Sequence, residues 1–193
     1  MQALNRSANF AATTGRKFGD AVSKFMGYRD FEQWTSNWGD TAHLPCLPSP
    51  DSDKYLDNFR HISRTGELKS LAMFWHGNLQ SYFLFFTMAG MHRDTASEFT
   101  EDAREYSCRL YDVLDMVRNL LVQMEMKTEF KLLQPPPSEC MQSACKFNVD
   151  PFHRLAISLR DSVSLLSDVR RRIDDFRLYY DDDRDASTDT TRS

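Results

Sequence analysis

The spacing of four long amphipathic segments constrains the fold of this 193-residue chain more than any other feature. Apolar residues recur three and four positions apart through four stretches, approximately residues 8–34, 67–92, 97–127 and 151–180. That period is typical of a helix with one buried face. We therefore predict four long helices with these approximate bounds.

The four segments differ in how strongly the sequence supports them. In the fourth, apolar residues repeat without a break from Phe152 to Tyr180, and Asp150 followed by Pro151 is a typical helix start. In the first, the pattern contains Gly15, Gly19 and Gly27, and an interior glycine costs about 1 kcal/mol relative to alanine. The fourth helix is the clearest prediction and the first is the weakest.

The connections between the predicted helices alternate long, short and long. The second and third helices are separated by about five residues, which forces them to be antiparallel. The outer connections have about thirty and more than twenty residues, and the first contains a short apolar pattern at Tyr55, Leu56, Phe59 and Ile62 that predicts a small extra helix. A helix of about 27 residues is about 40 Å long, and a dozen extended residues can recross it. We predict an all-α, long-chain four-helix bundle, up-up-down-down, with two long crossover loops.

Composition and charge exclude several other classes. Glycine and proline number only seven each, which is low for an all-β protein. The net charge is −4, and residues 181–193 contribute −3 of it, from five Asp and two Arg. We therefore expect a domain over residues 1–180 and an acidic, unstructured tail over 181–193. The near-neutral body lacks the basic stripe of nucleic-acid-binding proteins, and no apolar run is long enough to insert in a membrane.

The sequence contains no recognisable catalytic or metal-binding motif. None of the five histidines stands in H-E-x-x-H or after Glu-x-x, and neither G-x-S-x-G nor a P-loop occurs. We expect no catalytic residue, no metal and no cofactor, and hence a protein that is not an enzyme.

The cysteines and one sequon bear on the compartment. Cys46, Cys108, Cys140 and Cys145 do not form a zinc pattern. In an extracellular protein, a disulfide from Cys108 to one of the loop cysteines would tether a crossover, whereas in the cytosol all four would be free. Asn5 begins a glycosylation sequon. We expect an extracellular protein, although residues 1–12 do not read as a signal peptide. The export route therefore stays open between a removed peptide and non-classical release.

Several short stretches resemble the interleukin-6 family of long-chain helical cytokines. Residues 172–178, Arg-Ile-Asp-Asp-Phe-Arg-Leu, resemble the end of the last helix in that family, and residues 78–82, Asn-Leu-Gln-Ser-Tyr, resemble part of its second helix. The prolines of residues 133–137 resemble a second crossover of the family, and Phe152 falls where relatives carry a receptor-binding phenylalanine. Leu155 departs from the family pattern, which often has a lysine there.

The resemblance implies a cytokine or growth factor that acts without chemistry of its own. Such a protein is a secreted, monomeric ligand that binds class I cytokine receptor chains, including a shared signal-transducing receptor, and signals by bringing them together. A specificity receptor would contact the end of the fourth helix, at Arg171 and Arg177, and the first crossover. One signalling receptor would contact the first and third helices, and another the tip that contains Phe152.

The residues themselves leave other interpretations open. From periodicity alone, Phe152 is equally the first core residue of its helix, and the arginines of the fourth helix are equally a solvated face. The alternative class of protein is an intracellular helical adaptor that binds a partner helix in a groove. An adaptor would have reduced cysteines and no glycan at Asn5.

Overall fold

The structure, a computed structural model of the 193-residue chain, describes residues 1–36, 44, 47–57, 63–89, 99–124 and 151–189, without the side chains of 151 and 178–189. All of the regular structure in these residues is helical, which confirms the predicted all-α class. The helices are α1 (Gln2–Phe25), α2 (Phe31–Ser36), α3 (Ser52–Leu56), α4 (Arg64–Ala89), α5 (Thr100–Gln123) and α7 (Pro151–Asp189).

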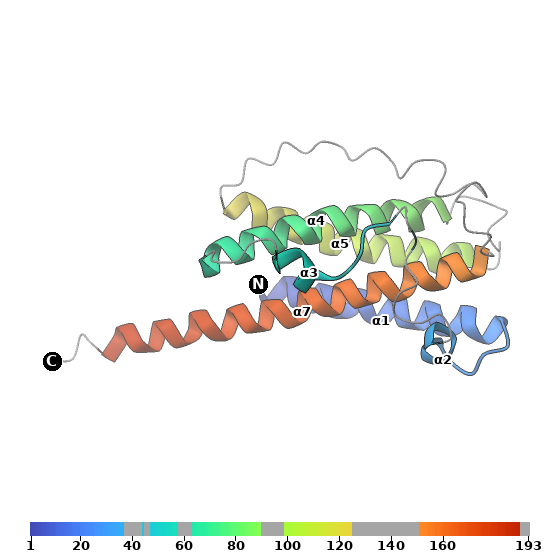
Figure 1. The fold of residues 1–193 in the computed structure, drawn as a ribbon, viewed down its shortest axis with the longest axis horizontal. Coiled ribbons are helices and arrows are strands. Elements are labelled where there is room, and N and C mark those ends of the chain that lie inside the picture. Colours follow the sequence, from blue (N-terminus) through green and yellow to red (C-terminus); the bar gives the residue numbers. More distant parts are fainter. Residues whose placement is uncertain (37–43, 45–46, 58–62, 90–98, 125–150, 190–193) are drawn as a thin grey trace.

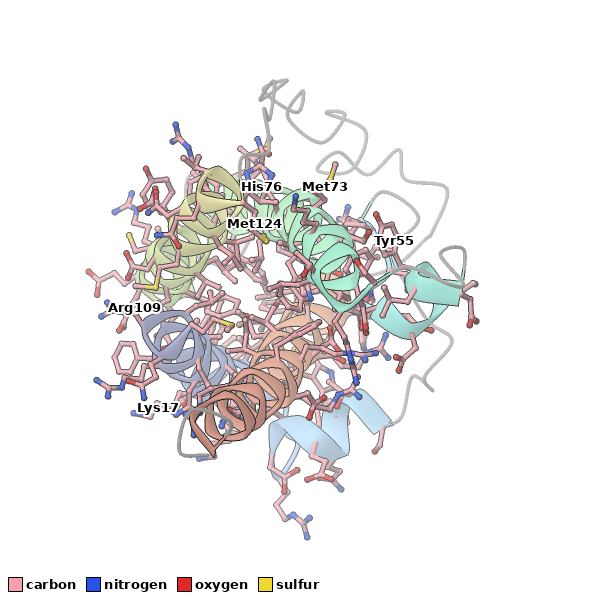
Figure 2. The ribbon with its side chains drawn as sticks, turned by 90° about the vertical axis from the view of Figure 1, so that its left-hand side faces the viewer. Lys17, Tyr55, Met73, His76, Arg109 and Met124 are labelled. Atoms are coloured by element: carbon pink, nitrogen blue, oxygen red, sulfur yellow. The ribbon has the colours of Figure 1, made fainter. Side chains whose placement is uncertain are left out.

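The four long helices lie side by side along the length of the molecule. In Figure 1, α1 and α4 run from left to right, and α5 and α7 run back from right to left. The main contacts join α4 to α5, α1 to α7 and α1 to α5, with a smaller contact between α4 and α7. Figure 2, which looks along the helices, shows that their side chains meet in one shared core.

The core is built from the predicted apolar stripes and is rich in aromatic rings. Trp75, Tyr82 and Phe86 of α4 are fully buried, as are Tyr106 of α5 and Phe176 of α7. The rings of Phe86 and Tyr106 meet edge to face with their centroids 4.8 Å apart, which is a favourable aromatic geometry. Through this packing, the four long helices share one continuous hydrophobic core.

The prediction of one uninterrupted first helix is wrong, because the segment divides into α1 and α2. Gly27 adopts a φ of 83°, a left-handed conformation that favours glycine and commonly ends a helix. Asp30 then caps α2, its carboxylate accepting a hydrogen bond from the backbone N–H of Gln33 at 2.8 Å. Asp20 of α1 accepts another from the N–H of Phe31 at 3.0 Å, so the two helices are joined at a fixed corner.

The other helices follow the predictions with shifted ends. The start of α7 at Pro151 is confirmed, but its backbone stays helical to Asp189, beyond the predicted end at 180, and projects past the neighbouring helices in Figure 1. The division into residues 1–180 and a tail stays a prediction. Helix α3 confirms the short helix at Tyr55 and Leu56, while Phe59 and Ile62 lie outside the described residues.

Among the described residues, no helix is both long enough and apolar enough to cross a membrane.

Candidate functional site

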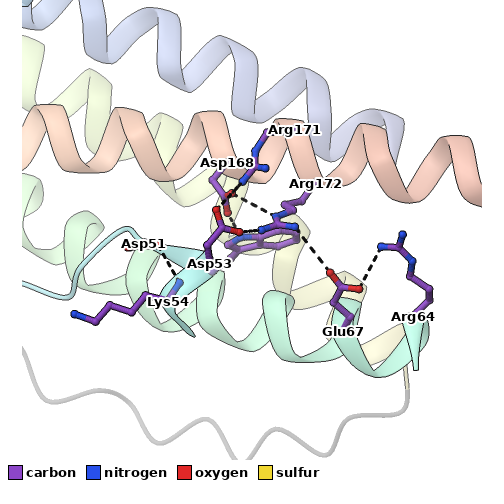
Figure 3. Close-up of polar contacts among 9 residues, drawn as sticks. Asp51, Asp53, Lys54, Arg64, Glu67, Asp168, Arg171 and Arg172 are labelled. Atoms are coloured by element: carbon purple, nitrogen blue, oxygen red, sulfur yellow. Dashed lines mark hydrogen bonds and ion pairs between the residues drawn. The ribbon is translucent and has the colours of Figure 1, made fainter. Parts of the chain in front are cut away.

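The most developed polar cluster of the described residues joins α3, α4 and α7. Asp53 of α3 faces two consecutive arginines of α7, Arg171 and Arg172, as Figure 3 shows. Asp168, one turn earlier on α7, and Glu67 of α4 complete the cluster. We call these five residues the α3 clasp, because they fasten the first connection to two of the long helices.

Arg172 is the inner cation of the α3 clasp. Its side chain is only 14% exposed, and its Nη2 donates a hydrogen bond to Oδ1 of Asp53. The carboxylate oxygens of Asp168 and Glu67 lie 3.7 Å and 3.9 Å from its nitrogens, which is close enough for attraction but too far for a hydrogen bond. Its buried Nε has no hydrogen-bond partner.

Arg171 is the outer cation, with a half-exposed side chain. Its Nη2 donates to Oδ1 of Asp168 at 2.9 Å and lies 3.6 Å from Oδ2 of Asp53. The hydrogen bond to Asp168 is the main cause that raises the pKa of Arg171 above its usual value, and the charges of nearby aspartates add to it. Asp168 is itself held by the indole N–H of Trp75 at 3.2 Å, so the core orients the outer pair.

A groove opens beside the α3 clasp. It has a volume of about 570 Å³, within the range of ligand sites. One wall is the segment Ser49–Asp53 and the other is the face of α7 between Arg160 and Arg171. Along this face, Arg160 donates to the buried Asp161 through a 2.9 Å ion pair. The groove is therefore polar, with charges of both signs.

The two arginines predicted as receptor contacts do not share a face of α7. Six residues separate Arg171 from Arg177, which rotates the two side chains about 120° apart around the helix. Seven residues separate Arg170 from Arg177, so these two project in nearly the same direction. Arg171 faces α3, whereas the exposed Arg177 lies on another side of α7.

Phe152 lies near the start of α7, half-buried against the core. Its ring centroid is 5.7 Å from that of Phe25, at the end of α1, and Phe25 lies 5.5 Å from Phe99. Phe25 is itself 54% exposed. Phe152 thus belongs to a row of three aromatic rings that leads from the core to the surface. Its half-buried position is compatible with both interpretations, a core residue and a receptor contact.

The remaining predicted site residues are Asn5 and the four cysteines. Asn5 lies within α1, and its side-chain N–H donates to the carboxylate of Asp174 on α7. Cys108 is a free, exposed thiol on α5. Cys46, Cys140 and Cys145 lie outside the described residues, so the disulfide pairing stays a prediction, as does a glycan at Asn5.

Sequence reasoning missed Asp53 and its pairing with Arg172, at the centre of the α3 clasp. No motif links them, because their contact joins positions 119 residues apart. Within the described residues, no group of three or more His, Cys, Asp or Glu side chains is arranged to hold a metal ion.

Comparison with known proteins gives no relative for this chain: no family model, curated protein or solved structure matches it.

Proposed function

We propose that this protein is a cytokine or growth factor that binds cell-surface class I cytokine receptors and signals by bringing receptor chains together. The proposed fold is a four-helix bundle of up-up-down-down topology with two long crossover loops. The ligand contributes surfaces rather than chemistry, and it works as a secreted monomer that engages a shared signal-transducing receptor.

The observation that carries the proposal is the direction and order of the long helices. Helices α1 and α4 run one way and α5 and α7 the other, so the chain between α1 and α4, and that between α5 and α7, must each return along the molecule. For the second return, the sequence between α5 and α7, residues 124–150, is long enough to span α5, a helix of 24 residues or about 36 Å. Crossover connections of this kind occur in the growth-hormone and cytokine bundles.

The distribution of candidate contacts supports separate receptor surfaces. The half-buried Phe152 stands at the start of α7, whereas Arg171 and the exposed Arg177 lie 19 and 25 positions further along that helix. A ligand that gathers two chains requires surfaces that do not overlap. Aromatic and arginine side chains are also the residues most enriched among interface hot spots.

The test is receptor activation on cells that express the receptors of the interleukin-6 family. Purified protein is added, and phosphorylation of the signal transducers is followed. Phe152→Ala and Arg177→Glu are each expected to shift the half-maximal concentration at least about ten-fold, the loss typical of a hot-spot residue.

Two variants on α4, a helix outside the proposed contacts, serve as matched controls. Met73→Ala removes an exposed apolar side chain, and Lys69→Glu reverses a charge. Both are expected to leave the response unchanged. A response that survives Phe152→Ala and Arg177→Glu unaltered contradicts the assigned sites.

The free thiol of Cys108 is the observation that favours the second candidate, an intracellular helical adaptor. A count of free thiols in protein recovered from its native compartment separates the two. Four free thiols favour the adaptor, whereas at least one disulfide favours the cytokine.

A further inference from the structure

Arg172 depends on one exposed carboxylate for its close hydrogen bonding. Among the described residues, Asp53 is the group that accepts a hydrogen bond from its guanidinium, and the buried Nε has no partner. A largely enclosed guanidinium with unused donors is costly, because its lost hydration is not replaced. Arg172 is therefore placed to bind an anion, and the anion that it binds, the Asp53 carboxylate, comes from another part of the chain.

The element that supplies this anion is small and lies on the surface. Helix α3 has five residues, too few to be stable on its own, and the side chain of Asp53 is 71% exposed. The same segment is held by the Tyr55 ring, 4.7 Å from that of Phe74, and by the Pro48 carbonyl, which accepts a hydrogen bond from the Tyr82 hydroxyl at 2.9 Å. The long helices pack against one another through their own core, so lifting α3 need not separate them.

Opposite charges meet where the strap crosses α7, at Asp53 and the two arginines. The strap Ser49–Asp53 brings the carboxylates of Asp51 and Asp53. On α7 the groove is lined by two arginines, at 160 and 171, and two aspartates, at 161 and 168. Arg172 lies beside this wall, and its other carboxylates, Asp168 at 3.7 Å and Glu67 at 3.9 Å, are too far away to accept hydrogen bonds from it. With the strap lifted, the Nη2 of Arg172 loses its hydrogen-bond acceptor and can donate to another carboxylate.

We propose that Arg172 and Arg171 form a carboxylate-binding site that Asp53 occupies within the chain, and that an acidic segment of a partner replaces Asp53 when α3 lifts. Arginine suits this exchange, because its planar fork pairs with any carboxylate. The groove beside Asp53 gives the incoming segment a place to enter. The identification of the partner as a receptor rests on the proposed function. The carboxylate site and its occupation by Asp53 do not depend on that function.

Chemical rescue tests the carboxylate site without any receptor. Asp53→Ala removes the internal anion and leaves room for a small one. We expect its melting temperature to fall by about 5 °C, and acetate at about 100 mM to restore at least half of that loss. Chloride at the same ionic strength should restore little, because a single spherical ion lacks the two oxygens with which a carboxylate matches the planar fork.

Asp57→Ala is the matched control, since Asp57 lies in the same segment and has the same charge but is not part of the α3 clasp. It should respond equally to acetate and chloride. Equal effects of the two salts on Asp53→Ala would overturn the site.

Peptide binding tests the internal competition. A fluorescent hexa-aspartate peptide should bind Asp53→Asn at least about ten-fold more tightly than the unaltered protein, and a hexa-lysine peptide should show no such gain. Asp53→Asn keeps the size of the side chain and one acceptor, which preserves the fold. Adding Arg171→Gln to this variant should reverse the gain. Equal affinity for the unaltered protein and Asp53→Asn would show that Asp53 does not occupy the site, even if cells respond to the protein.

Discussion

The glycines of α1 show how single residues set the distance between the long helices. A Cβ atom on Gly15 would lie 2.7 Å from both Cε2 of Tyr106 and Cγ2 of Val163. These atoms belong to α5 and α7, so Gly15 is the point at which three helices converge. In the sequence the glycine counts only as a cost to helix stability, because the neighbour that requires it is known only from the fold.

Gly15→Ala is expected to destabilise the protein by about 1–3 kcal/mol, since the added methyl must displace a buried tyrosine ring or a valine. Gly77→Ala is the control, because a Cβ there meets nothing within 4 Å and alanine favours helix by up to about 1 kcal/mol. Urea unfolding of the two variants measures the difference. Equal effects would contradict the close approach of α1 to its neighbours.

Two buried tyrosines couple stability to alkaline pH. Burial is the main cause that raises the pKa of Tyr82 and of Tyr106 above the ordinary value, and the hydrogen bond with Ser162 only partly opposes it for Tyr106. Both tyrosines stay protonated in the folded chain at a pH where the unfolded chain has released those protons. Their contribution to stability is complete below the unfolded pKa of about 10 and is lost as pH rises above it.

The free energy of unfolding is therefore expected to fall above pH 10 by about 1.4 kcal/mol per pH unit for each of these tyrosines. Tyr106→Phe removes one of the two titrating groups, so it should reduce that slope by about 1.4 kcal/mol per pH unit. The variant leaves Ser162 satisfied, because its hydroxyl still donates to the Leu159 carbonyl at 3.0 Å. Urea unfolding at pH 9, 10 and 11 gives the slopes; identical slopes for the two proteins would show that Tyr106 titrates normally.

At the scale of elements, local sequence signals were sufficient to predict a helix where the apolar periodicity was strong. The stripes of the second, third and fourth helices and the start at Pro151 are all confirmed, because one buried face and a proline at the first helical position leave few alternatives. The corner between α1 and α2 was missed although its signals were present. Gly27 followed by Asp30 is a helix end and a new cap, but continuing aromatic residues, Phe31 and Trp34, resembled the same stripe.

Gly27→Ala is expected to destabilise the protein by about 1–2 kcal/mol, because alanine at a φ of 83° is sterically strained. Thermal unfolding measures the loss, with Gly77→Ala again as the control. A stabilised Gly27→Ala would instead support the single long helix that the sequence pattern predicts.

The candidate site was predictable only in part, for reasons that also lie at this scale. Arg171 and Phe152 were named from the family resemblance, and their receptor roles stay predictions. The separation of Arg171 from Arg177 around α7 follows from helical geometry alone. Asp53 and Arg172 could not be paired, since the contact depends on how the first connection folds back across α7.

At the scale of the whole molecule, a packed core holds the candidate surfaces apart. Long aromatic-rich helices fix the distance between the Phe152 end and the arginines of α7, and the α3 clasp fastens the first connection between α4 and α7. In the proposed function the protein acts by geometry: its effect depends on how many receptor chains one molecule contacts at once. That dependence is measurable as a function of ligand concentration.

The most direct measurement is transducer phosphorylation in receptor-bearing cells over a wide range of protein concentration. A ligand that bridges chains should give a response that rises and then declines, because excess ligand occupies each chain separately. No response at any concentration in cells that carry the receptors of the interleukin-6 family, or a response that only rises to a plateau, would contradict the proposal that this protein signals by bringing receptor chains together.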